Sequence, residues 1–290
     1  MNTDQLVSIV IPCYKMGKFI GEALESVGKQ TYGDWEVIAV DDCGPEDGTQ
    51  AIVESFAKSH PDHRVEFIRH EKNKGVSAAR NTAIHAAEGK YLAFLDPDDF
   101  WGSSYLWSHV KNLESHVNTA VSYTSARLVD QEGVITGEIF GPDIIDLPES
   151  LYFQCLIIPS AVMAKRENVI LCGGFDETPE LQHAEDWDLW LRMIEKEMGF
   201  CYTSSAICFW RQHQGASTFD PAARRAREIA LRRKHSELLA YYNRNLLRQI
   251  LHRLDHLEGK QEAFEGSLFF RLGRLLSSFL KKLMLRGNLR

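Results

Sequence analysis

Short apolar runs alternate with stretches of helical spacing along the first hundred residues. The apolar runs, which predict strands, are Leu6–Ile11, Trp35–Val40, Arg64–Arg69 and Tyr91–Leu95. The segments that predict helices are Phe19–Gly28, Thr49–Lys58 and Gly75–Glu88. Strands that alternate with helices join through right-handed crossovers into a mainly parallel sheet. We therefore expect the carboxyl ends of these strands along one edge.

The pattern changes in the second half of the chain. Between Ala120 and about Leu171 the apolar runs are short and separated by Gly, Pro and acidic turns, which predicts shorter and partly antiparallel strands. A helix with Trp187 and Trp190 on one face follows, and the chain is predicted to be helical from Ala222 onward. The expected fold class is α/β.

An acidic cluster closes the last of the four predicted strands. Asp96, Asp98 and Asp99 follow Tyr91–Leu95 directly, and carboxylates this close together repel one another unless a cation or hydrogen-bond donors offset their charge. Oxygen ligands favour Mg²⁺ or Mn²⁺ over zinc. The same residues are equally typical of a solvated turn that caps a helix, and both interpretations stay open at this point.

Composition narrows the class of protein. Hydrophobic residues make up 44% and charged residues 25%, values that exclude a disordered chain. No apolar run approaches the roughly 20 residues that cross a bilayer, and Met1–Gln5 is too polar to begin a secretory signal. The six cysteines contain no Cys-x-x-Cys pair, which predicts reduced thiols rather than zinc ligands or disulfides. We expect a cytoplasmic protein.

Charge is distributed unevenly. Residues 222–290 contain 16 Lys and Arg against 6 Asp and Glu, whereas residues 1–221 contain 17 against 34. In the segment Gly266–Arg290 a helical wheel gathers leucines and Phe279 on one side and basic residues on the other, which is typical of a helix lying on an anionic membrane. The alternatives are that this helix packs on the preceding domain or pairs in a homodimer. A basic tail beside an acidic body disfavours nucleic acid as a partner.

The expected sheet edge is suited to a nucleotide. Tyr14 and Asp42 each follow a predicted strand, so they should converge with the acidic cluster. A tyrosine ring can stack on a base, and a carboxylate can accept hydrogen bonds from a base or ribose. The chain has neither a Gly-x-Gly-x-x-Gly motif nor a P-loop, which disfavours dinucleotide and Walker-type sites.

A series of short motifs resembles the inverting glycosyltransferases of family 2, of the bacterial surface-polysaccharide type. The motifs, which span roughly residues 6 to 218, are VSIVIPCY (7–14), SVGKQT (26–31), VDD (40–42), NKGVSAARN (73–81), FLDPDD (94–99), GGF (173–175), AEDWDLWLR (184–192) and WRQH (210–213). The resemblance implies a GT-A fold, with a mainly parallel central sheet flanked by helices.

The resemblance also implies roles for residues on the donor side. It implies that Pro12, Tyr14 and Asp42 hold the nucleotide base, that Arg80 lies near the base or diphosphate, and that Arg211 lies against the diphosphate. Asp96 and Asp98 form the Asp-x-Asp element, which binds ribose and a divalent cation, Mg²⁺ or Mn²⁺. The metal ligands implied are Asp98, Asp99 and His213.

The resemblance implies that Asp186 is the general base and that Glu185 supports it or contacts the acceptor. The residues alone are compatible with this role, because Glu185 and Asp186 open a predicted helix whose N-terminus favours ionised carboxylates. An acidic N-cap without catalytic function fits the pattern as well.

The sequence thus predicts a metal-dependent glycosyltransferase of the hexosyltransferase type. It is expected to use a nucleotide sugar, in particular a UDP-sugar, and a glycan or lipid-linked acceptor at the cytoplasmic membrane face. The expected domains are a GT-A domain over 1–218, with a nucleotide-sugar half (1–119) and an acceptor half (120–218), and a helical extension over 219–290. The alternatives are a sugar-nucleotide nucleotidylyltransferase and a non-catalytic membrane-associated scaffold.

Overall fold

The protein was analysed as a computed structural model, which describes residues 5–116, 118–139, 151, 155, 157–213, 221–241, 244 and 275–282. The chain divides into two compact units, Met1–Leu231 and Arg232–Arg290. The predicted domain boundary at residue 218 stays a prediction. Most of the predicted amphipathic helix, residues 266–274 and 283–290, lies outside the described residues.

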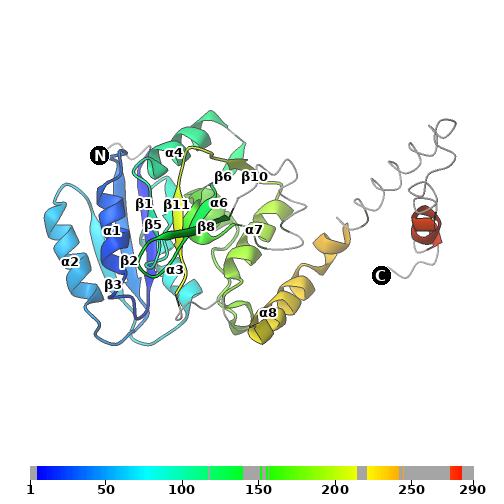
Figure 1. Cartoon of the computed structure of the whole chain (residues 1–290), viewed down its shortest axis with the longest axis horizontal. Helices are drawn as coiled ribbons and strands as arrows, with labels where there is room; N and C mark the ends of the chain where they lie inside the picture. Colours follow the sequence, from blue (N-terminus) through cyan, green and yellow to red (C-terminus); the bar gives the residue numbers. More distant parts are fainter. Residues whose placement is uncertain are drawn as a thin grey trace. The chain divides into compact units, whose positions relative to one another are not determined.

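A seven-stranded sheet in the order β10-β6-β9-β4-β1-β2-β3 forms the centre of the first unit (Figure 1). Its strands are β1 (Val7–Cys13), β2 (Trp35–Asp41), β3 (Val65–Arg69), β4 (Tyr91–Phe94), β6 (Thr119–Tyr123), β9 (Val162–Lys165) and β10 (Gly199–Tyr202). β1 pairs in parallel with β2 and β4, and β2 pairs in parallel with β3. β9 runs antiparallel to both β4 and β6. The sequence-based expectation of a mainly parallel sheet with antiparallel strands in the second half is confirmed.

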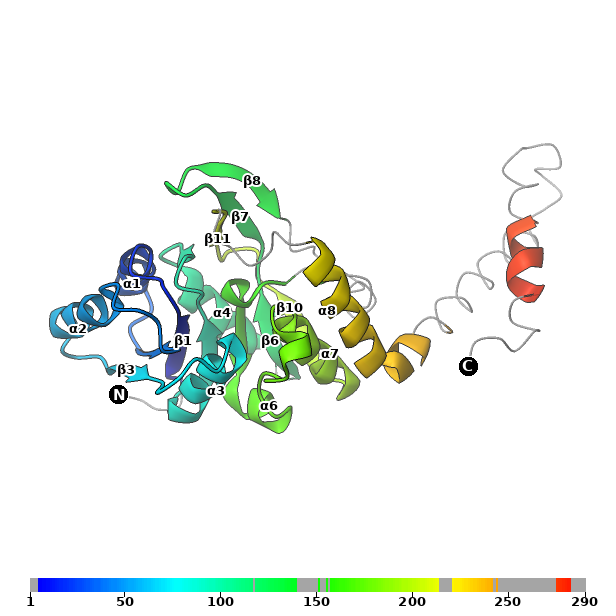
Figure 2. The same cartoon turned by 90° about the horizontal axis from the view of Figure 1, so that it is seen from below.

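Helices cover both faces of this sheet. The helices of the described residues are α1 (Ile20–Gly28), α2 (Thr49–Ser59), α3 (Val76–Ala86), α4 (Tyr105–Ser115), α6 (Arg166–Leu171), α7 (Glu185–Glu195) and α8 (Pro221–Lys234), with short 3₁₀ turns at η1 (Pro159–Ala161) and η2 (Pro179–Leu181). α1 and α2 lie on one face, and α3 and α6 lie on the other (Figure 2). This alternation follows from the strand order, because right-handed crossovers place helices on opposite faces where the chain reverses direction across the sheet.

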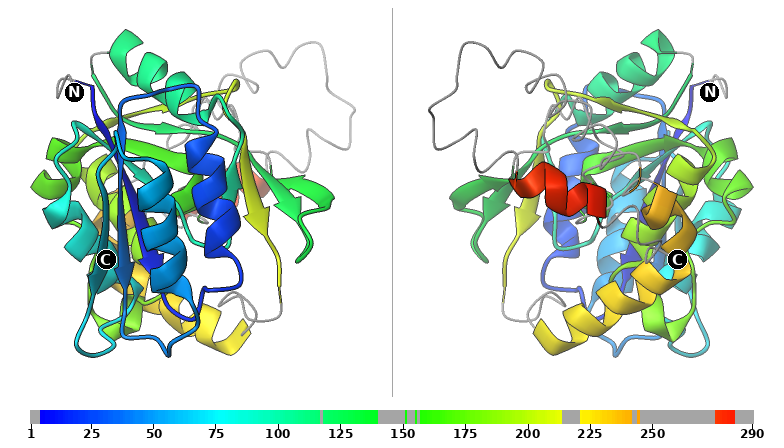
Figure 3. Two further views of the ribbon diagram at one scale, coloured as in Figure 1. Left: turned by 90° about the vertical axis from the view of Figure 1, so that its left-hand side faces the viewer. Right: turned by 90° about the vertical axis from the view of Figure 1, so that its right-hand side faces the viewer.

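A second, four-stranded sheet stands beside α1 (Figure 3). Its order is β5-β11-β7-β8, with bounds β5 (Phe100–Trp101), β7 (Ala126–Val129), β8 (Ile135–Ile139) and β11 (Cys208–Arg211). β5 directly follows the acidic cluster, and β11 ends two residues before His213. The small sheet therefore brings residues about 110 positions apart in the chain to the same corner.

The core is dominated by strands that are buried on both faces. Every residue of β1, β2 and β4 is buried, as expected for central strands of a parallel sheet with helices on both sides. The six cysteines are free thiols, three of them buried. Among the described residues, no helix is long and apolar enough to cross a bilayer.

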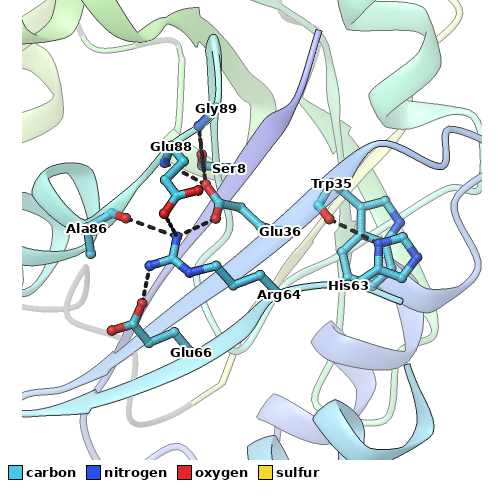
Figure 4. Close-up of polar contacts among 9 residues, drawn as sticks. All are labelled: Ser8, Trp35, Glu36, His63, Arg64, Glu66, Ala86, Glu88 and Gly89. Atoms are coloured by element: carbon cyan, nitrogen blue, oxygen red, sulfur yellow. Dashed lines mark hydrogen bonds and ion pairs between the residues drawn. The ribbon is translucent and has the colours of Figure 1, made fainter. Parts of the chain in front are cut away.

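A buried carboxylate joins the starts of four strands at the edge opposite the acidic cluster (Figure 4). Glu36, at the beginning of β2, is 1% exposed. It accepts hydrogen bonds from Ser8 Oγ (2.5 Å), from Arg64 Nη1 (2.5 Å) and from the amides of Glu88 and Gly89 (2.7 and 3.2 Å). These donors lie in β1, before β3 and before β4, so one side chain connects all four parallel strands.

Candidate active site

Asp42 follows β2 and is held by the loop that leads into α3. Its carboxylate accepts hydrogen bonds from the amides of Lys74 (2.8 Å) and Gly75 (2.7 Å) and contacts Nδ1 of His70 at 2.7 Å. Asp42 is only 3% exposed. The structure therefore places it at the carboxyl edge of the sheet, as predicted, and its oxygens orient the loop before α3.

Tyr14 lies at the same edge and is 41% exposed. Lys15, the next residue, has a positive φ of 60°, and its ammonium lies 5.0 Å from the centroid of the Tyr14 ring. Pro12 is buried within β1, opposite Val40 of β2. Tyr14 thus presents an accessible aromatic face, whereas Pro12 belongs to the strand that supports it.

Asp98 and His213 meet at the corner formed by the two sheets. Nε2 of His213 lies 3.0 Å from Oδ2 of Asp98, and the His213 ring packs against Phe19 at 4.8 Å between centroids. Burial and the neighbouring Asp96 raise the pKa of Asp98, and the hydrogen bond from His213 opposes this rise.

The 3.0 Å separation between His213 Nε2 and Asp98 Oδ2 is that of a hydrogen bond. The carboxylate oxygen and the imidazole nitrogen are both groups that can bind a divalent cation in place of this hydrogen bond. No group of three or more His, Cys, Asp and Glu in the described part of the chain could hold an ion by itself. An ion at this corner would complete its shell with water and substrate oxygens, as Mg²⁺ commonly does.

Asp99 faces the protein interior. It is 2% exposed, and its Oδ1 accepts a hydrogen bond of 2.9 Å from the amide of Arg211. Burial, together with the negative charges of Asp98 and Asp96, raises the pKa of Asp99 well above its usual range. The structure thus directs Asp99 toward the backbone of β11, and its predicted role as a metal ligand stays a prediction.

Arg211 connects three parts of the site through protein contacts. Its guanidinium donates to the carbonyls of Asp98 (2.8 Å) and Gln131 (2.7 Å) and forms an ion pair with Glu22 of α1. The side chain is 2% exposed. Its predicted contact with a diphosphate stays a prediction.

Arg80 lies between the acidic cluster and α7. Nη2 donates to Asp96 Oδ1 and Nη1 donates to Glu185 Oε1, each at 2.6 Å. Arg80 and Glu185 are 3% and 4% exposed, and the guanidinium lies 5.2 Å from the centroid of Phe175. Sequence reasoning placed Arg80 beside the donor; the structure adds that it links two of the other predicted residues.

Asp186 lies in the first turn of α7. Its Oδ1 accepts a hydrogen bond of 2.7 Å from the amide of Trp187, and its Oδ2 lies 3.7 Å from the thiol of Cys155. Burial and the adjacent Glu185 raise the pKa of Asp186 to about 7, against the hydrogen bond from Trp187 and the charge of Arg80. A carboxylate that titrates near neutral pH can take up a proton and release it again, which general base catalysis requires.

Three supporting residues were missed by sequence reasoning. Ser160 is fully buried, and its hydroxyl accepts a hydrogen bond of 2.9 Å from the amide of Asp96. His70 contacts Asp42, and Cys155 contacts Asp186. Ser160 and Cys155 lie in an apolar stretch, residues 151–164, where small residues are read as core positions, so the sequence gives no signal that they contact the site.

Comparison with known proteins places these features in a family. Residues 8–138 match the family described as Glycosyl transferase family 2. The chain is 32% identical over 200 residues to the glycosyltransferase TuaG of Bacillus subtilis, named for teichuronic acid biosynthesis, with 67% of this chain and 74% of TuaG covered. It is 31% identical over 205 residues to WfgD of Escherichia coli, a UDP-Glc:alpha-D-GlcNAc-diphosphoundecaprenol beta-1,3-glucosyltransferase, with 71% and 76% covered.

Solved structures confirm the fold. The TarS 1–349 complex of S. aureus with UDP-GlcNAc superposes with a TM-score of 0.61 at 22% identity, covering 74% of this chain and 62% of that one. The mannosyltransferase PcManGT of Pyrobaculum calidifontis, in complex with GDP-Man and Mn²⁺, gives 0.55 at 18% identity, covering 76% and 60%. The chain thus spans about three fifths of each of these two solved chains.

Proposed function

The chain belongs to glycosyl transferase family 2 and has the GT-A fold, and we propose that it transfers a sugar from a nucleoside-diphosphate sugar to a hydroxyl group of a glycan with inversion at the anomeric carbon. The observation that carries this proposal is the arrangement at the carboxyl edge of the sheet. An accessible aromatic ring, a corner suited to a cation and a carboxylate that titrates near pH 7 all lie along that edge.

The donor is proposed to bind between Tyr14 and the acidic cluster. Tyr14 would stack on the base, Asp42 would bind polar groups of the base, and Asp96, whose side chain is 28% exposed, would accept hydrogen bonds from the ribose. UDP is the favoured nucleotide, because WfgD is named for UDP-Glc and TarS was solved with UDP-GlcNAc.

Asp98 and His213 are the residues that would hold Mg²⁺ or Mn²⁺. Such an ion, when bound, neutralises the charge that develops on a departing diphosphate. The meeting of a carboxylate and an imidazole at one corner and the Mn²⁺ in the PcManGT complex support this assignment.

Asp186 is proposed to act as the general base. As the acceptor oxygen attacks the anomeric carbon from the face opposite the diphosphate, the hydroxyl proton passes to Asp186. The bond from the anomeric carbon to the diphosphate oxygen breaks, and its electron pair leaves with the nucleoside diphosphate. One displacement of this kind inverts the configuration. A glycan or lipid-linked acceptor is supported by the names of TuaG and WfgD.

A membrane surface is proposed as the second partner. In the described part of the C-terminal unit, residues 275–282 are helical, and Leu275, Leu276 and Phe279 are 69%, 54% and 59% exposed. The last two described residues of this helix are Lys281 and Lys282. Exposed apolar residues beside basic ones are suited to an anionic lipid surface.

The proposal is tested by supplying UDP-, GDP- and TDP-sugars with Mn²⁺ or Mg²⁺ and a panel of lipid-linked or free glycans. We expect transfer from one class of donor, an inverted anomeric product by NMR, and loss of turnover in EDTA. Formation of a nucleotide sugar from a sugar phosphate and a nucleoside triphosphate would instead identify a nucleotidylyltransferase. Donor binding without turnover for any acceptor would favour a scaffold.

A further inference from the structure

A single buried cation joins the two chemical halves of the site. Arg80 on α3 donates one nitrogen to Asp96, at the end of β4, and the other to Glu185, at the start of α7, both at 2.6 Å. Asp96 is 16 residues away in the sequence and Glu185 is 105 residues away. A planar guanidinium can hold two carboxylates in a fixed relation, whereas an ammonium acts as a point charge.

The burial of this triad indicates that Arg80 acts through its neighbours. Arg80 is 3% exposed, and both terminal nitrogens are engaged by carboxylates. Asp96 is the most exposed of the three side chains, at 28%, so a donor molecule would reach Asp96 before it reached Arg80. Removing one partner from a buried ion pair leaves an uncompensated charge and is strongly destabilising.

Two buried atoms of the triad have no hydrogen-bond partner among the described residues, namely Nε of Arg80 and Oε2 of Glu185. Buried polar atoms are nearly always paired in folded proteins.

Glu185 directly precedes Asp186, so the negative charge of Glu185 acts on the proposed base and raises its pKa. Further charged or titratable groups around Asp186 are Arg80 from α3, Asp96 from the end of β4 and Cys155.

We infer that Arg80 is a positioning residue that couples the donor side of the site, at Asp96, to the base side, at Glu185 and Asp186. This inference rests on the proposed function and deepens it. Arg80 holds Glu185 in place and leaves Asp96 able to bind the donor. The distance and orientation between the bound sugar and the base are thereby kept constant. The positive charge of Arg80 also favours the ionised form of the base.

The first test separates positioning from direct donor binding. Arg80→Lys keeps the charge but not the two-pronged geometry. We expect its donor Kd, measured by calorimetry with the nucleotide sugar that the wild type uses, to stay within about threefold, and its kcat to fall at least about tenfold. A donor Kd raised about tenfold with kcat unchanged would show that Arg80 binds the donor and would overturn the inference.

Arg192→Lys is the matched control. Arg192 lies on α7, pairs with Asp188 at 2.8 Å and donates to the carbonyl of Gly174 at 2.7 Å, all away from the site residues. It should lower Tm as Arg80→Lys does while leaving kcat close to the wild-type value. Equal losses of kcat in the two variants would reduce Arg80 to a general packing role and would contradict the inference.

The second test uses a background that avoids an unpaired buried charge. Glu185→Gln removes the negative charge beside Asp186, so the pKa of Asp186 should fall. The acid limb of the plot of kcat against pH should then move to lower pH. Adding Arg80→Gln removes the nearby cation, so this acid limb should move back to higher pH. The ¹³C carboxyl signal of Asp186, identified by its loss in Asp186→Asn, reports the same shifts without turnover. Identical titration with and without Arg80→Gln would refute the coupling.

Failure of the inference and failure of the proposed function give different results. If the wild type transfers sugar but Arg80 variants change neither kcat nor the titration of Asp186, only the inference is wrong. If the wild type turns over no donor while the Asp186 signal still responds to Arg80→Gln, the coupling holds and the proposed activity is wrong.

Discussion

At the scale of single residues, the acids of the site differ because their surroundings differ. Asp98 faces the corner with His213, whereas Asp99, its neighbour in sequence, is bonded to the amide of Arg211 inside the protein. Asp186 is half-buried beside Glu185, and its pKa is raised to about 7. One type of side chain can therefore serve as a ligand, as a structural support and as a base.

Asp186→Asn should abolish transfer and leave donor binding intact. Removal of a general base typically costs about 10²- to 10⁴-fold in rate, and the amide side chain is nearly isosteric with the carboxylate. In the wild type, kcat should rise with pH through about 7, because only the ionised carboxylate of Asp186 accepts the proton. A variant that keeps full activity would rule out Asp186 as the base.

The same variant should change how stability depends on pH. The pKa of Asp186 rises from 3.8 to about 7 on folding, so the folded state holds the proton more tightly. The stability that this protonated group contributes is complete below pH 3.8 and is lost as pH rises through about 7. Asp186→Asn should therefore stabilise the protein more at pH 8 than at pH 5. The gain in the free energy of unfolding should be larger at pH 8 by on the order of a few kcal/mol, and Tm should rise accordingly.

Asp98 and Asp99 form a matched pair for a test of the metal corner. Asp98→Asn should weaken activation by Mn²⁺ at least about tenfold, because one of two protein ligands becomes a neutral amide. Asp99→Asn should change Tm more than it changes the metal concentration for half-maximal activity, because Asp99 bonds to the Arg211 backbone. Metal titrations of activity together with thermal unfolding separate the two effects. If Asp99→Asn weakened activation by Mn²⁺ and Asp98→Asn mainly changed Tm, Asp99 would be the metal ligand and Asp98 the structural residue.

At the scale of elements, the start of α3 shows how a local motif serves the site. Gly75 has φ 94° and ψ 163°, a conformation that is essentially restricted to glycine, and its amide donates to Asp42. A Cβ atom at this position would lie 2.5 Å from Nε2 of Gln182, in the loop before α7. The NKGVSAARN motif thus contains a glycine that the backbone requires.

Gly75→Ala should therefore destabilise the chain by about 1–3 kcal/mol and weaken donor binding. The displaced amide would no longer hold Asp42, which is proposed to bind the base. Gly33→Ala is a suitable control, because a Cβ there meets no atom within 4 Å and its φ is not in the left-handed region. Chemical denaturation and donor calorimetry measure the two effects, and equal behaviour of both variants would show that the φ of Gly75 is not limiting.

Elements of the first half were predictable because their signals are local. The run Tyr91–Leu95 was predicted as a strand and β4 occupies Tyr91–Phe94, since a short apolar run followed by a turn specifies its own ends. The partners of Arg80 and Arg211 were not predictable in this way. The ion pairs of Arg80 with Glu185 and of Arg211 with Glu22 span 105 and 189 residues, and such pairing is decided by the packing of the whole sheet.

At the scale of the whole molecule, the division of charge suggests a division of roles. Residues 1–221 have a net charge of −17 and residues 222–290 a net charge of +10. An acidic body is repelled by anionic lipid, and a basic segment is attracted to it with about 1 kcal/mol per Lys or Arg near the surface. This asymmetry is the reason for proposing that the basic segment holds the enzyme at a lipid-linked acceptor.

Deletion of residues 266–290 should reduce binding to anionic liposomes. The rate of sugar transfer from the donor to a soluble acceptor should stay unchanged. The exposed Leu275, Leu276 and Phe279 are lost with this segment. Cosedimentation with phosphatidylglycerol vesicles at low and high salt measures the effect, and neutral vesicles are the control. Unchanged binding would favour packing on protein or dimerisation.

The buried Glu36 has a consequence for which arrangement of strands the chain can adopt. Its four donors come from the starts of β1 and β3 and from the turn before β4, so they converge only when these strands are neighbours in the native register. A slip of one residue in β2 would move Glu36 to the other face and bury its charge without donors, at a cost of several kcal/mol. The carboxylate thereby penalises misaligned sheets, and it secures the alignment from which Tyr14, Asp42 and Asp96 reach a common edge.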